Sequence, residues 1–196
     1  MIELAAFLSL AMRCAPGVHP DTAQDVVRVE SGFQPYAIAV VGGKSIYPLS
    51  LNDAVSHTNR LSREGKNYSV GLMQINQVNF KKYGVSAEQL FDPCTNLSVF
   101  EKIITDCYIR GGDLERALSC YYSGNFETGK KKEKTFQNTS YTERIGYVPV
   151  NYIVPSTKAD KSKEEKETHT DKDINTQVVV IYPSRVIRGD LQISEN

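Results

Sequence analysis

A carboxylate at the end of a short helical pattern is the residue best placed for chemistry. Pro20 suits the first turn of a helix. Ala23, Val26 and Val27 then recur at the spacing that puts side chains on one face, and Glu30 continues that apolar face. Loss of water and the partial negative charge at a helix C-terminus both disfavour an ionised carboxylate. We therefore expect Glu30 to have a raised pKa, as a general acid requires.

For a single glutamate considered alone, a non-catalytic interpretation is also available, because buried carboxylates are rare in proteins. Glu30 could lie at a frayed helix end, where its carboxylate reaches solvent or pairs with an arginine. Ser31 and Gly32 follow it directly and end the helical pattern. The neighbouring stretches of chain decide between the two readings.

A second informative stretch covers residues 68–76 and reads Tyr-Ser-Val-Gly-Leu-Met-Gln-Ile-Asn. Its composition predicts an extended run, and Gly71 inside such a run marks a place where a backbone or a ligand approaches closely. Gln74 and Asn76 are the polar groups there. We interpret this stretch as a second source of functional side chains.

Composition excludes several classes of function. In 196 residues, 23 basic side chains balance 23 acidic ones, so no bulk charge favours nucleic acid. The cysteines Cys14, Cys94, Cys107 and Cys120 show no Cys-x-x-Cys spacing and the three histidines are scattered, so we expect no metal site and no cofactor. The cysteines could form disulfides or remain buried thiols. We predict that Cys107 is a buried thiol on an apolar helix face, and a disulfide with Cys120 is the alternative.

The apolar run at residues 4–12 is too short to span a bilayer, so no stable membrane insertion is expected. No lysine or arginine precedes this run and no small-x-small cleavage site follows it, which makes it a poor signal peptide. We predict an amphipathic first helix that packs on the domain, with a role in export as the alternative.

The remaining chain predicts helices around one small extended region. Helix start and stop signals recur along residues 1–150, and a short strand is expected at 37–41. Further helices are predicted at 51–64, 78–83, 93–111, 114–123 and 141–147. This order indicates one mainly helical α+β domain over 1–150.

The composition changes after that domain. Residues 151–176 are predicted to be a charged flexible linker, because almost nothing apolar is present to repay the entropy of ordering. Residues 177–196 form a short β-prone tail, in which the β-branched run 178–181 could pair with the sheet edge of a partner. We expect the C-terminal part to be disordered on its own.

Three stretches in this order resemble the soluble lytic transglycosylase domain, whose members cut bacterial peptidoglycan. They are residues 29–31 (Val-Glu-Ser), 71–76 (Gly-Leu-Met-Gln-Ile-Asn) and 117–124 (Ala-Leu-Ser-Cys-Tyr-Tyr-Ser-Gly). Residues 14–16 (Cys-Ala-Pro) and 92–96 (Asp-Pro-Cys-Thr-Asn) are most similar to the specialised members encoded with type IV secretion systems. The resemblance runs from residue 11 to about 148 and does not cover the tail.

The resemblance implies a lysozyme-like fold with a small β-sheet beside the cleft and Glu30 as the sole catalytic acid and base. By the same resemblance Ser31, Met73, Gln74 and Tyr121 would bind the substrate. The family's third motif usually reads Ala-Tyr-Asn-Ala-Gly. Here Cys120 replaces the first alanine and Tyr122 replaces the asparagine, which puts hydrogen bonding in one sugar subsite in doubt.

Cys14 and Cys94 both match cysteines of the specialised members, so the resemblance implies a disulfide between them. An oxidising compartment such as the bacterial periplasm would allow that bond. The expected partners are peptidoglycan glycan strands, together with type IV secretion components that the C-terminal tail would contact.

The implied activity is cleavage of the β-1,4 bond between N-acetylmuramic acid and N-acetylglucosamine, with formation of 1,6-anhydromuramic ends. That activity would open the cell wall locally for assembly of a type IV secretion system. One alternative is a hydrolytic muramidase, which would need a second carboxylate such as Asp53 or Glu64. The other is a non-catalytic scaffold that binds glycan or secretion components.

Overall fold

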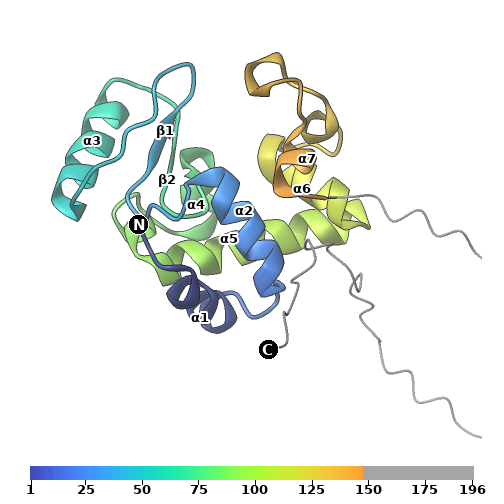
Figure 1. Ribbon diagram of the computed structural model, residues 1–196. Helices are drawn as coiled ribbons and strands as arrows, with labels where there is room; N and C mark the ends of the chain where they lie inside the picture. The colour runs from blue at the N-terminus through green and yellow to red at the C-terminus, as the bar shows by residue number, and fades with distance from the viewer. Residues whose placement is uncertain (148–196) are drawn as a thin grey trace, which may run out of the picture. The chain divides into compact units, whose positions relative to one another are not determined.

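The computed structural model describes residues 1–147, which form one compact unit (Figure 1). The predicted linker (151–176) and β-prone tail (177–196) lie outside the described residues. The helices and strands are α1 (Leu4–Cys14), α2 (Pro20–Glu30), β1 (Ile38–Val40), α3 (Leu51–Arg63), β2 (Tyr68–Val70), β3 (Ile75–Asn76), α4 (Phe80–Tyr83), α5 (Pro93–Gly111), α6 (Leu114–Ser123) and α7 (Tyr141–Ile145). Short 3-10 turns lie at Gln77–Asn79, Gln89–Phe91, Thr128–Lys130 and Lys134–Phe136. A mainly helical α+β fold with a small sheet is confirmed.

The long helix α5 is the central support of the domain. Asp92 caps its first turn by accepting a hydrogen bond from Thr95 N at 2.8 Å, and Gly112 ends it in the left-handed conformation. Its buried face includes Leu97, Phe100 and Ile104. The helix contacts α1 and α6, and in the view of Figure 1 α2 passes in front of it. The core therefore forms around α5.

The sheet has three short antiparallel strands in the order β1-β2-β3. Ile38 pairs with Val70, and Ser69 pairs with Asn76. The prediction of a single extended run over 68–76 is wrong, since a turn at 71–74 separates β2 from β3. Gly71 begins that turn with φ +79°, and a Cβ there would lie 2.2 Å from Asn96 Nδ2. The close approach inferred at Gly71 is thus made by the amide of Asn96.

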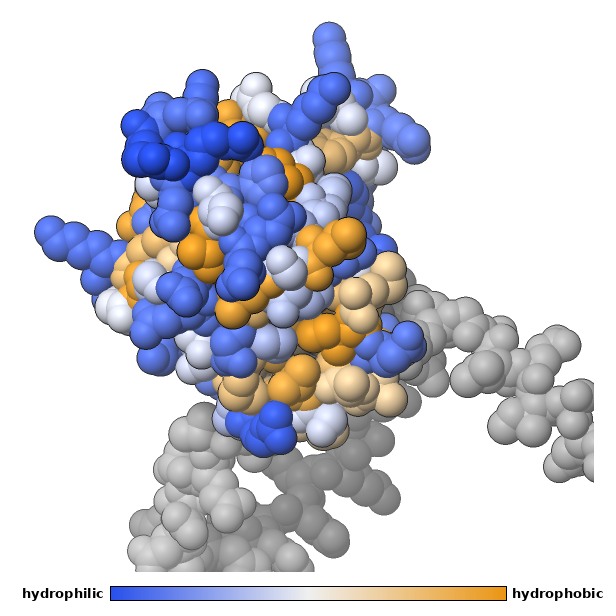
Figure 2. Space-filling view, turned by 90° about the vertical axis from the view of Figure 1, so that its left-hand side faces the viewer, coloured by the Kyte–Doolittle hydropathy of each residue, from blue (hydrophilic) through white to orange (hydrophobic). Residues whose placement is uncertain are grey.

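The N-terminal apolar run forms α1, which buries Phe7, Ala11 and Cys14. The predicted amphipathic first helix is confirmed. Leu4 and Met12 remain exposed on the same helix. On the face of the molecule shown in Figure 2, hydrophobic residues gather in the lower part and hydrophilic residues dominate the upper part. Within residues 1–147, no helix combines the length and the apolar character that crossing a bilayer requires.

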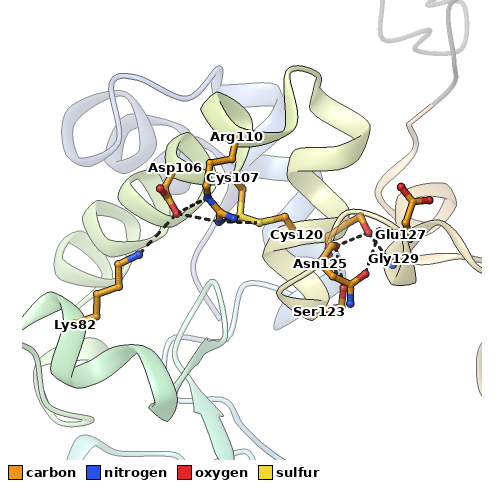
Figure 3. The surroundings of a disulfide bond; sticks show 10 residues. Lys82, Asp106, Cys107, Arg110, Cys120, Ser123, Asn125, Glu127 and Gly129 are labelled. Carbon is orange, nitrogen blue, oxygen red and sulfur yellow. Dashed lines mark hydrogen bonds and ion pairs between the residues drawn. A yellow bond between two sulfur atoms is a disulfide. The ribbon is translucent and has the colours of Figure 1, made fainter.

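Two disulfides link elements of the domain. Cys14 at the end of α1 is bonded to Cys94 in the first turn of α5, the pair that the resemblance implies. Cys107 of α5 is bonded to Cys120 of α6, so the reading of Cys107 as a buried thiol is wrong (Figure 3). These consecutive helices pack closely enough to bring the two Cα atoms to 5.7 Å, a normal separation for a disulfide.

Candidate active site

Glu30 is the last residue of α2 and keeps intermediate solvent exposure. Desolvation is the largest influence on its carboxyl group and raises the pKa to about 7. Two smaller influences act in the opposite direction, namely a hydrogen bond from Tyr141 and the positive charge of Arg144. The expectation of a raised pKa follows from the same physical cause, loss of water on an apolar helix face.

A carboxyl group with a pKa near 7 is populated in both protonation states at neutral pH. It can donate a proton in one step and accept one in the next, which is the requirement for a single acid and base catalyst. The residue as a whole keeps intermediate exposure, whereas its carboxyl group is strongly desolvated. The site therefore has the chemistry of general acid and base catalysis at one residue.

Tyr141 is a neighbour of Glu30 that sequence reasoning missed. Its phenol donates a hydrogen bond to Glu30 Oε1, although 111 positions separate the two residues in the chain. The side chain is almost fully buried at the first position of α7, a helix that opens with a capping box between Ser140 and Glu143. The capping pattern could have marked the helix start, but nothing local in the sequence connects that helix with Glu30.

Ser31 lies directly after Glu30 at the C-terminal cap of α2. The residue is buried, and its Oγ has no hydrogen-bond partner among the described residues. Leaving a buried hydroxyl without a partner costs free energy, which a bound ligand with a suitable polar group would remove. The Ser31 hydroxyl therefore keeps the capacity to donate or accept a hydrogen bond at the end of α2.

Gln74 has its side-chain amide engaged with the backbone. Nε2 donates to Ala37 O at 3.0 Å and to Gly71 O at 2.7 Å, while Oε1 accepts from Ala39 N at 3.2 Å. Both amide protons are used, and only Oε1 keeps a free lone pair. Gln74 thus ties β1 to the turn at 71–74, and its predicted contact with substrate stays a prediction.

Tyr121 and Met73 join α6 to the turn between β2 and β3. The Tyr121 phenol donates to the carbonyl oxygen of Met73. Burial raises the pKa of Tyr121 well above 10, and the negative charge of Glu30 adds to that effect, so the phenol lies within electrostatic reach of the carboxyl group. The Met73 side chain is fully buried, so its predicted contact with substrate requires its neighbours to move and stays a prediction.

The two carboxylates considered for a hydrolytic mechanism belong to α3 and its C-terminal cap. Asp53 lies 3.5 Å from His57 and Glu64 lies 4.0 Å from Arg60, and each acidic side chain is about half exposed. In the part of the chain that the structure describes, the groups that shift the pKa of Glu30 are Tyr141 and Arg144. No second carboxylate is among them.

No cluster of three or more histidine, cysteine, aspartate or glutamate side chains able to hold a metal ion occurs within residues 1–147. The polar groups that interact with Glu30 are the phenols of Tyr141 and Tyr121 and the guanidinium of Arg144. Such a set can move protons and bind a neutral polar ligand.

Comparisons with known proteins identify one domain family and a group of relatives that share the name virB1. The family described as Transglycosylase SLT domain matches residues 7–143. "Type IV secretion system protein virB1" of Brucella suis biovar 1 is 38% identical over 200 residues, covering 92% of this chain and 84% of the relative. The protein of the same name from Brucella abortus biovar 1 is 43% identical over 152 residues, covering 72% of this chain and 63% of the relative. "Protein virB1" of Agrobacterium fabrum is 30% identical over 173 residues, covering 84% of this chain and 68% of the relative. No solved structure matches significantly.

Proposed function

The chain belongs to the transglycosylase SLT domain family, and on that premise we propose that it is a peptidoglycan lytic transglycosylase with Glu30 as its catalytic residue. The bond cleaved would be the β-1,4 bond between N-acetylmuramic acid and N-acetylglucosamine. Because the similar Brucella proteins are named as type IV secretion system proteins, we propose that the activity opens the cell wall locally for such a system. The place of action would be the periplasm, where disulfides form.

The single observation that carries the proposal is the position of Glu30 at the end of α2, where its carboxyl group is desolvated and accepts a hydrogen bond from the Tyr141 phenol. Glycosidases that use water or a covalent intermediate need two carboxylates. A transglycosylase needs one, because the substrate supplies its own nucleophile. One desolvated carboxyl group is therefore sufficient for transglycosylation, and the products of digestion distinguish that reaction from hydrolysis.

In this mechanism, protonated Glu30 donates its proton to the glycosidic oxygen as the bond to the muramyl C1 breaks. The substrate's acetamido group helps to carry the positive charge that develops on that carbon. Glu30, now ionised, takes the proton from the muramyl 6-hydroxyl, and the oxygen closes the 1,6-anhydro ring. The carboxyl group ends in its starting state and no water is consumed.

The neighbours of Glu30 receive roles that fit their positions. The unpartnered Oγ of Ser31 supports a hydrogen bond to the acetamido group of the muramyl residue. Tyr121 holds the Met73 carbonyl and thereby the turn that faces the site, and the free lone pair of Gln74 Oε1 can accept one bond from a sugar hydroxyl. Tyr141 stabilises the ionised form of Glu30 between the two proton transfers.

The test compares wild-type protein with Glu30→Gln in digests of purified peptidoglycan, with released muropeptides identified by mass spectrometry. The amide keeps the shape of the carboxyl group but cannot donate and recover a proton, so we expect cleavage to fall by about 10²- to 10⁴-fold. Wild-type products should carry 1,6-anhydromuramic ends.

Glu64→Gln is the matched control, because it makes the same chemical change at a half-exposed carboxylate and should leave cleavage unchanged. Circular dichroism would verify that both variants fold. Near wild-type activity in Glu30→Gln would refute the assignment, and reducing muramic ends would indicate hydrolysis instead.

A further inference from the structure

Tyr122 stands where the family's third motif usually has asparagine, and its ring lies against the tyrosine that contacts Glu30. The rings of Tyr122 and Tyr141 are stacked, with centroids 4.4 Å apart and an interplanar angle of 15°. Tyr141 in turn donates its hydrogen bond to Glu30. One face of the donor's ring is thus covered by a side chain from α6.

The hydroxyl of Tyr122 extends this arrangement to the segment before α7. It donates to Glu133 Oε1 at 2.8 Å, and Glu133 Oε2 lies 3.5 Å from Arg144 Nη1, with both charged side chains largely buried. The Arg144 guanidinium lies 3.9 Å from the ring centroid of Phe136, and its Nη1 donates to Thr139 O at 3.2 Å. Arg144 is one of the two groups that lower the pKa of Glu30.

Helix α7 depends on such contacts for its position. It has five residues, and a helix of that length is not stable by itself in water. Contacts with α2 and α6 hold it, including a hydrogen bond of 3.2 Å from Arg28 Nη2 to Arg144 O. A ring stacked on Tyr141 therefore restricts where the phenol of Tyr141 can lie.

We propose that Tyr122 is a positioning residue for the proposed catalytic acid: its stacked ring holds the Tyr141 phenol in hydrogen-bonding contact with Glu30. The inference rests on the proposed function only for its consequence in catalysis. The link from Tyr122 through Tyr141 to Glu30 is a property of the ligand-free protein and can be tested without substrate.

The direction of the effect follows from the groups that face the carboxyl group. These are Tyr141 and Arg144 from α7 and Tyr121 from α6, with Glu133 one contact further away beside Arg144. The Tyr141 hydrogen bond favours the ionised form of Glu30. Removing the ring of Tyr122 lets Tyr141 leave that contact, so the pKa of Glu30 should rise.

The experiment is a carbon-13 NMR titration of the Glu30 carboxyl group in the full-length, ligand-free chain, with the signal assigned by its loss in Glu30→Gln. Tyr122→Leu removes ring and hydroxyl, and we expect it to raise the Glu30 pKa by about 0.5 or more, a threefold change in the ionisation constant. Tyr122→Phe keeps the stacked ring and should stay within about 0.2 of wild type. Tyr122→Asn introduces the usual family residue and also removes the ring, so it should raise the Glu30 pKa as Tyr122→Leu does. It replaces the leucine variant in the experiment if that variant folds poorly.

Two results would overturn the proposal. The first is an unchanged Glu30 pKa in folded Tyr122→Leu and Tyr122→Asn. The second is a full shift in Tyr122→Phe, which would assign the effect to the hydroxyl and Glu133 rather than to the stacked ring.

Activity then gives an independent measurement. The limb of kcat/KM that falls as Glu30 loses its proton should move to higher pH in Tyr122→Leu by the same amount as the titration. A shift in the titration without anhydromuramic products from wild type would refute the proposed function and leave the positioning role intact. Anhydromuramic products from wild type, without a shift of the Glu30 pKa in Tyr122→Leu, would support the proposed function and refute the positioning role.

Discussion

At the scale of single residues, one carboxyl group is balanced between two opposing influences. Burial at the end of α2 raises the pKa of Glu30, whereas the phenol of Tyr141 and the charge of Arg144 lower it. A group that must give up a proton and then recover it works best when its pKa is near the ambient pH. The neighbours of Glu30 bring its pKa close to that value.

This balance predicts a dependence of stability on pH. The pKa of Glu30 is about 7 in the folded protein, above the reference value of 4.5, so the folded state binds the proton more tightly. The resulting stabilisation is complete below pH 4.5 and is lost as the pH rises through 7. Relative to Glu30→Gln, the wild-type free energy of unfolding should fall by about 1–3 kcal/mol between pH 4 and pH 8.

Urea unfolding of both proteins at the two pH values measures that difference. Glutamine is the suitable reference because its amide oxygen can still accept the Tyr141 hydrogen bond, so the contact is kept while the titration is removed. A difference between the two proteins that does not change with pH would show that the Glu30 carboxyl is not desolvated.

At the scale of elements, the site is assembled by short segments that are held to a long helix. Asn96 in α5 shows how this works. Its Nδ2 donates to Val70 O and Leu90 O, and its Oδ1 accepts from Met73 N, so one buried side chain fastens β2 and the following turn to α5. The Tyr121 bond to Met73 fastens the same turn to α6. Short strands and a five-residue helix therefore acquire fixed positions from packing rather than from their own length.

The disulfides act on the same scale and predict a ranking. The Cys14–Cys94 bond spans 80 positions and the Cys107–Cys120 bond spans 13. A longer closed loop removes more entropy from the unfolded chain, so the loop-closure model gives about 4.5 kcal/mol for the first bond and about 3 kcal/mol for the second. Denaturant unfolding of Cys14→Ala/Cys94→Ala and Cys107→Ala/Cys120→Ala, each against wild type, measures both values. A larger loss for the second pair would contradict the ranking.

At the scale of the whole molecule, the described unit of Met1–Tyr147 contains every residue of the candidate site and the core that supports it. The family match ends within the same unit, at residue 143. We therefore expect the proposed chemistry to depend on this unit alone. Any role of residues 178–181 in contacting a secretion component would be separate from cleavage.

We expect deletion of residues 158–196 to leave cleavage of isolated peptidoglycan within about twofold of wild type, because no group that contacts Glu30 among the described residues is removed. The measurement is the rate of muropeptide release, with unfolding by urea as the control for folding. A folded but inactive truncated protein would place part of the active site in the deleted segment.

Local patterns in the sequence were sufficient for most elements and for the main residue of the site. Helix caps such as Asp92 and Asp113, the stop at Gly112 and the apolar spacing before Glu30 act over three or four residues, so they can be read without the fold. The same periodicity placed Glu30 on an apolar face and predicted its raised pKa. The mainly helical class followed from the order of these elements.

Contacts between distant parts of the chain could be decided only by the tertiary structure. Three contacts join different elements: the hydrogen bond from Tyr141 to Glu30, the hydrogen bond from Ala39 N of β1 to Gln74 Oε1, and the disulfide between Cys107 and Cys120. Helix periodicity states which face a residue occupies but not which element will cover it. Packing around α5 makes that choice, and so determines which hydroxyl and which guanidinium adjust the acidity of Glu30.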